Sequence, residues 1–241
     1  MTHALNRLVG RCLRLTPLTA GAVPRLAAWR ARRRADALYA KYRDATKLQA
    51  WSYRDNLQLC ALVQSVPGCV VECGVWRGGM AAGLVEWLGD TRRYYLLDSF
   101  EGLPAPAAVD GDFSRAVQTH PDWDNCAATL AEAQATLARA GTASVTYVRG
   151  WFKDTIPGLA LPEPIALLRL DADWYDSTMQ CLDGLYDLVA PGGLILIDDY
   201  HFWEGCTRAV HDFLSKRQLV ARLRERPHGV AYIVKDAERR R

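Results

Sequence analysis

The chain has 241 residues, enough for one domain with an ordinary buried core, and its apolar share of 50% and charged share of 24% are those of a soluble globular protein. The formal net charge of +3 is too small for a protein that binds polyanions over its whole surface. The seven cysteines form no C-x-x-C pair and no metal-ligand pattern with histidine. We therefore expect neither a zinc site nor a disulfide framework, and we predict a cytoplasmic protein.

The first part of the chain is strongly basic. Residues 1–34 contain eight arginines and no acidic residue. They contain no apolar run near the roughly 20 residues of a membrane-spanning helix, and Arg11 and Arg14 interrupt the apolar core that a secretory signal needs. We predict a basic helical arm or lid over residues 1–60, exposed to solvent. Contact with a membrane surface is the less favoured alternative, and we expect no nucleic-acid partner.

From residue 35 onwards the sequence predicts helices and strands in alternation. Residues 35–66 have the long side chains and alanines of a helix, which Pro67 and Gly68 end. Short apolar runs predict strands over residues 69–73, 94–97, 145–148, 165–170 and 194–197, with a closing pair over 219–223 and 230–234. Further helices are expected over residues 79–88, 124–140, 176–189 and 204–217. This order predicts an α/β fold in which helices cover both faces of a mostly parallel sheet.

A turn rich in glycine follows the first expected strand. Glu72, Gly74, Gly78 and Gly79 lie between this strand and the next helix. Glycine lets the backbone approach a ligand closely, and a helix N-terminus offers free N–H groups to an anionic group. The spacing differs from G-x-G-x-x-G, so a dinucleotide is less well supported than another nucleoside cofactor. A simple tight turn is the alternative.

Asp98 supports the cofactor interpretation. It ends the second strand, 26 residues after Glu72, near the offset at which an acid binds ribose hydroxyls. The alternative is an N-cap or an Asx turn, because Ser99 and Gly102 follow. At the third strand end, Gly150 and Trp151 offer an aromatic wall for an adenine ring, or ordinary core packing.

Three aspartates follow two later strands. Asp171 ends one apolar run, and Asp198 and Asp199 end the next. Carboxylates that meet at one sheet edge repel one another unless a cation or a proton lies among them, and Asp oxygens suit Mg²⁺. The alternative is helix capping by Asp198 or Asp199, with Asp173 or Asp176 at the start of the preceding helix.

Several motifs together resemble those of the macrocin/mycinamicin-type (TylF-like) O-methyltransferases. They are VVECGVWRGG, LLDSFEGLP, GWFKDTIP, LRLDADWYDST and PGGLILIDDYHFWEGCTRAVHDF, in this order. The resemblance implies a Rossmann-like class I methyltransferase domain over residues 61–241, with a mostly parallel seven-stranded sheet. It also implies transfer of a methyl group from S-adenosylmethionine to a hydroxyl of a sugar or hydroxylated natural product, with Mg²⁺.

The resemblance also implies roles for individual residues. Asp171, Asp198 and Asp199 are the expected metal ligands, and Asp171 is the expected base. The residues expected at S-adenosylmethionine are Glu72, Gly74, Val75, Trp76, Asp98, Ser99, Phe100, Gly150, Trp151 and Asp171.

Some alternatives stay open. His201 is the other candidate base, because an imidazole titrates near neutral pH, and His120 is a weaker one. Tyr200, Phe202 and Trp203 line an acceptor pocket or pack in the core. A catechol-type O-methyltransferase, a nicotinamide oxidoreductase and a nucleoside-binding or nucleic-acid-associated module compete with the preferred function. We expect a homo-oligomer with a small-molecule acceptor.

Overall fold

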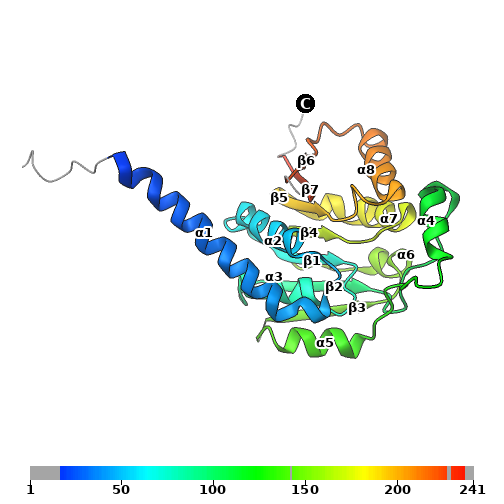
Figure 1. Ribbon diagram of the computed structural model, residues 1–241. Helices are drawn as coiled ribbons and strands as arrows, with labels where there is room; N and C mark the ends of the chain where they lie inside the picture. Colours follow the sequence, from blue (N-terminus) through cyan, green and yellow to red (C-terminus); the bar gives the residue numbers. More distant parts are fainter. Residues whose placement is uncertain (1–16, 142, 227–228, 237–241) are drawn as a thin grey trace, which may run out of the picture.

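The computed structural model describes residues 17–141, 143–226 and 229–236 of the chain (Figure 1). The predicted arm falls partly outside these residues, because residues 1–16 are not described. The helices are α1 (Pro17–Tyr42), α2 (Ala50–Leu59), α3 (Gly79–Leu88), α4 (Gly111–Gln118), α5 (Leu130–Ala138), α6 (Phe152–Thr155), α7 (Tyr175–Leu185) and α8 (Glu204–Lys216). The strands are β1 (Cys69–Cys73), β2 (Arg93–Asp98), β3 (Ser144–Arg149), β4 (Ile165–Leu170), β5 (Val189–Ile197), β6 (Arg224–Glu225) and β7 (Ala231–Val234).

The seven strands form one sheet in the order β3-β2-β1-β4-β5-β7-β6. The five strands β1 to β5 pair in parallel, and β7 is antiparallel to both β5 and β6. The prediction of a mostly parallel, seven-stranded sheet is therefore confirmed. Since β1, β2, β4 and β5 are neighbours with aligned registers, their carboxyl ends lie together at one edge, where the glycine turn and the acidic motifs follow.

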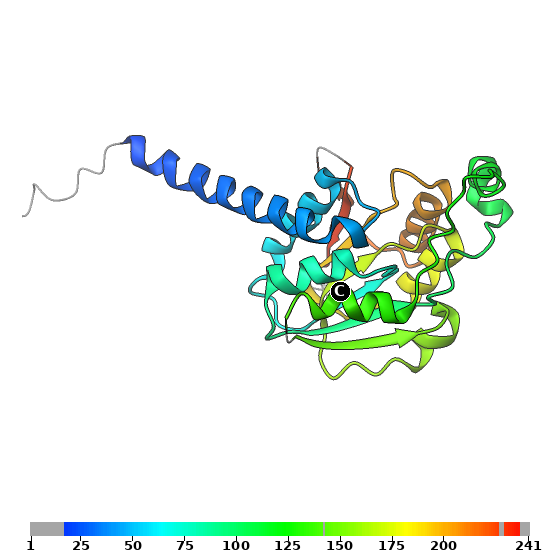
Figure 2. The ribbon, with the colours of Figure 1, turned by 60° about the horizontal axis from the view of Figure 1, so that its bottom comes forward.

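Helices cover both faces of the sheet, as predicted (Figures 1 and 2). One buried cluster joins the sheet to α1, α2, α3 and α5, and a second joins its other face to α7 and α8. Every residue of β1 and β4 is buried, which explains why these strands read as continuous apolar runs. Among the described residues, no helix combines the length and the apolar character that crossing a bilayer requires.

The prediction of one helix over residues 35–66 is wrong. Helix α1 begins earlier, at Pro17, and ends at Tyr42, after which Arg43–Ala45 form a single 3₁₀ turn and Thr46 is extended. A Cβ at Gly79 would lie 2.4 Å from the carbonyl oxygen of Ala45, so the chain turns where it crosses the start of α3. Helix propensity is overridden here by a tertiary contact.

The end of the sheet also differs from the prediction. Residues 219–223 are not a strand, because Arg224 and Glu225 are the residues that pair with β7. The predicted helix over 124–140 begins only at Leu130, where the Thr129 side chain accepts a hydrogen bond from the Glu132 backbone N–H. Helix α4 lies in a segment for which the sequence predicted no helix.

Candidate active site

A cavity of about 640 Å³ lies at the carboxyl ends of β1, β2, β4 and β5. Most of the residues predicted to bind cofactor or metal line it, and so do residues 45–49 from the link between α1 and α2 and residues 51 and 52 from the start of α2. The predicted residues in its lining are Glu72, Gly74, Val75, Trp76, Asp98, Ser99, Gly150, Trp151, Asp171, Asp198 and Asp199. Two predicted residues, Phe100 and His201, are not in the lining.

The turn after β1 is held by Asp98. One oxygen of this carboxylate accepts hydrogen bonds from the backbone N–H groups of Val75 and Trp76, at 2.7 and 2.9 Å. The other accepts one from Phe100 N–H at 2.7 Å, which is the Asx turn considered as the alternative. A carboxylate has about four acceptor positions, so Asp98 retains capacity for a ligand hydroxyl.

A side chain at Gly74 would displace the backbone of Asp171 at the end of β4. Its φ is +85°, and a Cβ there would lie 1.7 Å from the carbonyl oxygen of Asp171. The glycine turn and the end of β4 are therefore in direct backbone contact, which places the two predicted halves of the site against each other.

Arg169 lies fully buried on β4 beneath the cavity and binds three acids. Its guanidinium is 2.9 Å from Glu72, 2.9 Å from Asp171 and 3.0 Å from Asp198. It also donates to the side-chain oxygen of Asn56 on α2, at 3.2 Å. The sequence did carry a signal for this residue, since an arginine inside an apolar strand run must find a charged partner when it is buried.

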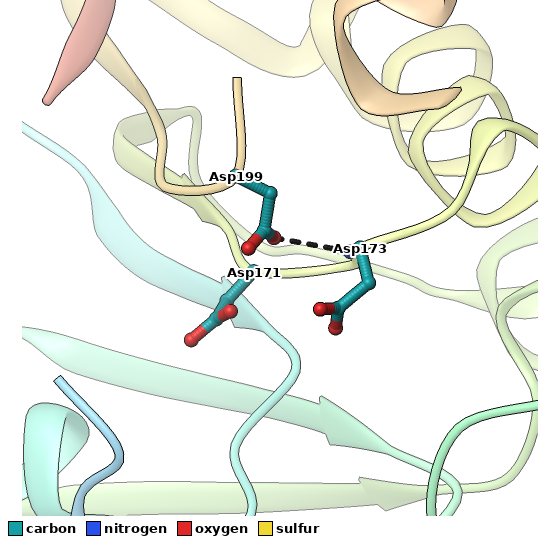
Figure 3. Close-up of side chains that lie close together, drawn as sticks. All are labelled: Asp171, Asp173 and Asp199. Carbon is teal, nitrogen blue, oxygen red and sulfur yellow. Dashed lines mark hydrogen bonds between the residues drawn. The ribbon is translucent and has the colours of Figure 1, made fainter. Parts of the chain in front are cut away.

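A second group of acids converges beside the first (Figure 3). Asp171, Asp173 and Asp199 each offer an oxygen within 4.8 Å of the others'. Asp199 accepts a hydrogen bond from the backbone N–H of Asp173 at 3.0 Å. The Asp173 carboxylate accepts one from the Trp203 ring N–H at 2.7 Å. Asp171 thus belongs to both groups, whereas Asp198 is turned toward Arg169.

Asp173 does not cap helix α7, which was the alternative role considered for it. Trp174 is the N-cap residue of α7, and Asp173 precedes it with a φ of +56°, a conformation that few residues other than glycine adopt. The strained turn directs its carboxylate into the cavity, whose lining it joins.

Burial and crowding raise the pKa of four acids in this region. Burial, opposed by the charge of Arg169, raises the pKa of Glu72 to about 8. Burial, reinforced by the charge of Asp171, raises the pKa of Asp173 to about 8. Burial also raises the pKa of Asp198, and it raises that of Asp199 well above its usual range. A single guanidinium cannot balance this many carboxylates, and the acids that keep a proton at neutral pH would give it up to a bound cation.

The donor set fits a hard divalent cation. Asp171, Asp173 and Asp199 supply carboxylate oxygens from two neighbouring strand ends, which is the chemistry that Mg²⁺ prefers. Asp198 engages Arg169 and the Asn56 amide through the same oxygen, Oδ1, so its other oxygen is the one that could reach a cation.

The two histidines considered as bases lie away from this cluster. The His201 side chain is 42% exposed and pairs with Glu225 at 3.0 Å. His120 is exposed and lies next to Asp122. Neither histidine lines the cavity.

The aromatic residues after β5 divide between the two roles considered for them. Phe202 and Trp203 line the cavity, whereas the Tyr200 hydroxyl lies 2.8 Å from a ring nitrogen of His211, outside the lining. The adjoining Lys47, from the α1–α2 link, packs 4.8 Å over the Trp76 ring and forms an ion pair with Asp124. No pattern in the sequence pointed to Lys47 or to Asn56.

Comparison with known proteins gives consistent matches. The family described as Macrocin-O-methyltransferase (TylF) matches residues 52–232. The chain is 41% identical over 171 residues to the 8-demethyl-8-(2,3-dimethoxy-alpha-L-rhamnosyl)-tetracenomycin-C 4'-O-methyltransferase of Streptomyces olivaceus, covering 67% of this chain and 65% of that one. It is 36% identical over 173 residues to the mycinamicin III 3''-O-methyltransferase of Micromonospora griseorubida, covering 67% of each.

A solved structure, that of the O-methyltransferase NovP, superimposes with a TM-score of 0.66 at 29% identity, over 76% of this chain and 79% of that one. The class I, Rossmann-like fold implied by the motifs is thereby confirmed. The aligned segment spans slightly less than two thirds of the length of the Streptomyces olivaceus relative. Since the family match covers most of the chain, the protein belongs to the macrocin O-methyltransferase family, as its motifs predicted.

Proposed function

We propose that this protein transfers a methyl group from S-adenosylmethionine to a hydroxyl of a sugar or hydroxylated natural product, and that it requires Mg²⁺. The observation that carries the proposal is the convergence of Asp171, Asp173 and Asp199 in the same cavity as the glycine turn. The relatives that are named as O-methyltransferases of a rhamnosyl-tetracenomycin and of mycinamicin III support a glycosylated acceptor.

The charges of the cavity suit this cofactor. Among the described residues its lining holds seven acids and one cation, Lys47, which is paired with Asp124. A cationic sulfonium and ammonium group are attracted by such a lining. Asp98 has acceptor capacity for a ribose hydroxyl, and Oε2 of buried Glu72 has no hydrogen-bond partner. Trp151 would stack on the adenine.

The acids of the cavity have two proposed roles, which are binding of the metal and acceptance of the proton. When bound, Mg²⁺ supplies a Lewis acid that lowers the pKa of the acceptor hydroxyl and fixes its oxygen. Asp171 and Asp199, with the free oxygen of Asp198, would hold it. Asp173 is the candidate proton acceptor beside the metal, because its carboxylate lies in the cavity and is held by the Trp203 ring N–H, whereas Asp171 is engaged by Arg169. His201 is the weaker candidate, because it does not line the cavity and pairs with Glu225.

Metal removal tests this function. Activity on a rhamnoside acceptor should be lost in EDTA and return with Mg²⁺, while calorimetry still detects S-adenosylmethionine binding, because the two sites use different strand ends. Asp171→Asn and Asp173→Asn should each lower kcat by about 100-fold or more, with His201→Ala as the matched control near wild-type turnover. Full activity in EDTA would refute the metal requirement, and low turnover of His201→Ala would return the base assignment to the histidine.

Three expectations from the sequence accompany this proposal. The division of the chain near residue 60 into an arm or lid and a methyltransferase domain remains a proposal, with residues 45–52 as the part of the lid that reaches the cavity. A homo-oligomer and a cytoplasmic location also remain predictions. A catechol-type acceptor is the competing substrate, and direct comparison of a catechol with a rhamnoside distinguishes the two.

A further inference from the structure

Asn56, on α2, is a fully buried amide next to the acids of the site. It has no exposed surface and does not line the cavity, so any role in the reaction must pass through its neighbours. A buried amide is costly unless its polar groups find partners. The proposed methyl transfer gives this residue no task, although Ser52, one turn earlier on the same helix, lines the cavity.

Both ends of the Asn56 amide make hydrogen bonds. The amide oxygen accepts one from Nε of Arg169 at 3.2 Å. The amide nitrogen donates to the carbonyl oxygen of Ser52 at 3.0 Å and to Oδ1 of Asp198 at 3.3 Å. These partners fix which way the amide faces, because a guanidinium can only donate and an ionised carboxylate can only accept.

Asn56 and Asp198 share one edge of the Arg169 guanidinium. Asn56 takes Nε, and Oδ1 of Asp198 lies 3.0 Å from the adjacent Nη2. The third nitrogen, Nη1, is bound by Glu72 and Asp171. Nε and the adjacent Nη2 of an arginine can together bind both oxygens of one carboxylate. Because Asn56 occupies Nε, only Nη2 is left for Asp198.

The second oxygen of Asp198 therefore stays away from the arginine. Both polar contacts of the Asp198 carboxylate in the described part of the chain are made by Oδ1. Nη2 of Arg169 is buried, and it has no partner with hydrogen-bond geometry among the described residues. Without Asn56, Nε would lose its acceptor as well, and a rotation of Asp198 would satisfy both nitrogens with both of its oxygens. That rotation would withdraw Asp198 from a cation, because both oxygens would then be engaged by the guanidinium.

We propose that Asn56 is a positioning residue for the metal, which keeps Asp198 on a single nitrogen of Arg169 so that the other carboxylate oxygen remains available to a divalent cation. This inference rests on the proposed function and adds to it a residue that lies outside the cavity. It also makes α2, which precedes the first strand, a part of the support of the metal site.

The test measures metal binding directly in the full chain with S-adenosylhomocysteine present. Mn²⁺ is the probe, and electron paramagnetic resonance of the free ion gives its Kd. Asn56→Ala should raise this Kd by about 10-fold, as expected when the partner that orients a metal ligand is removed. The affinity for S-adenosylhomocysteine should stay within about 2-fold of the wild type, because Asn56 does not line the cavity.

Turnover gives a second readout that a merely structural role would not produce. The Mg²⁺ concentration for half-maximal activity should rise in Asn56→Ala by about the same factor as the Kd, whereas kcat at saturating Mg²⁺ should stay within about 2-fold of the wild type. Asn56→Leu, which fills the same space without polar groups, should behave alike and remains informative if the alanine variant does not fold.

A neighbouring residue on the same helix provides the matched control. Asp55 is also buried, but it faces Arg226 at 3.4 Å instead of the acids, so Asp55→Asn should keep the wild-type affinity for Mn²⁺. A double-mutant cycle separates positioning from packing. In an Asp198→Asn background, which lacks the ligand that Asn56 positions, Asn56→Ala should change the Kd for Mn²⁺ by less than about 2-fold.

The outcomes separate this inference from the function itself. Wild-type affinity for Mn²⁺ in both Asn56 variants would overturn the inference while the methyltransferase function stands. A full further loss in the Asp198→Asn background would also overturn it, because Asn56 would then act on packing and not through Asp198. Weaker Mn²⁺ binding in the variants, together with full wild-type activity in EDTA, would support the inference and reject the metal requirement. Absence of Mn²⁺ binding by the wild type would overturn both.

Discussion

Arg169 sets the charge balance of the site. It is fully buried, and Glu72, Asp171 and Asp198 all bind it. Although burial lowers its pKa, the three carboxylates together raise that pKa well above its usual range, so the guanidinium stays charged. One cation thereby fixes side chains at the ends of three strands, β1, β4 and β5, where a ligand needs them in a single orientation.

Replacing Arg169 tests this role. Arg169→Met should lower the free energy of unfolding by about 3–5 kcal/mol, because it leaves buried carboxylates without their counter-charge. Adding Asp198→Asn should recover part of that loss, since one unpaired acid is then removed. Urea unfolding monitored by circular dichroism gives both values. If the double variant is less stable than Arg169→Met, the acids do not depend on the guanidinium in this way.

Glu72 predicts a pH dependence of stability. Its pKa is about 8 in the folded protein against a usual value of 4.5, because the side chain is buried. Between these values the folded state keeps a proton that the unfolded state has lost, so stability should fall as pH rises from 4.5 to 8. The expected slope is up to roughly 1.4 kcal/mol per pH unit for one proton.

Glu72→Gln should make this dependence shallower in metal-free buffer, measured by urea unfolding at a series of pH values. Asp173 contributes in the same direction, so part of the slope should remain. The same slope in Glu72→Gln and in the wild type would show that Glu72 is ionised in the folded state.

At the scale of elements, two connecting segments close over the cavity from opposite sides. The link between α1 and α2 contributes Lys47, and the loop between α4 and α5 contributes Asp124. The Lys47 ammonium binds Asp124 and also lies over the ring of Trp76, so three segments meet at this point. We expect this contact to slow the exchange of a ligand bound in the cavity.

Breaking this ion pair should change the dissociation rate of a bound ligand more than the stability of the fold. Both side chains are about half exposed, so the pair contributes at most about 1 kcal/mol to folding. Lys47→Ala and Asp124→Ala should each raise the dissociation rate of S-adenosylhomocysteine by roughly 2- to 5-fold in stopped-flow measurements, within the energy of one exposed pair. Arg217→Ala, which removes a comparable pair with Asp187 far from the cavity, should leave the rate unchanged. An unchanged rate in the Lys47 and Asp124 variants would exclude a closing role for the pair.

At the scale of the whole molecule, α1 has two different parts. Its N-terminal part extends beyond the body of the protein (Figure 2), whereas Ala35, Leu38 and Tyr42 near its end are buried in the core shared with α2 and α3. The basic character of the chain is concentrated before this buried part. Within the arm or lid proposed for residues 1–60, the residues from Ala35 onwards therefore differ from those before them, because they pack against the body of the protein.

Two truncations separate these parts. A chain that starts at Ala35 should bind S-adenosylhomocysteine within about 2-fold of the full chain, because no cavity residue is lost. A chain that starts at Lys47 should lose about 10 °C in Tm, because Leu38 and Tyr42 are among the buried side chains it lacks. Calorimetry and thermal unfolding check both. Loss of binding in the first truncation would place the arm within the site.

The sequence by itself determined the order of the parallel strands along the chain and the strand ends that carry Asp98, Asp171, Asp198 and Asp199. These features follow from local signals, because an apolar run, a glycine turn and the acid that follows them each occupy only a few neighbouring residues. Because parallel strands end at one edge, the meeting of the glycine turn with the acids could also be predicted.

Only the tertiary structure decided how the acids share their partners. The sequence favoured Asp198 as a metal ligand and gave Asp173 only as a possible start of the next helix, but Asp198 binds Arg169, and Trp203 holds Asp173 in the cluster. Likewise, nothing in residues 35–66 separates α1 from α2, although the intervening link lines the cavity. These outcomes depend on which side chains approach from distant parts of the chain, and burial makes each such charge pairing strong enough to override local preference.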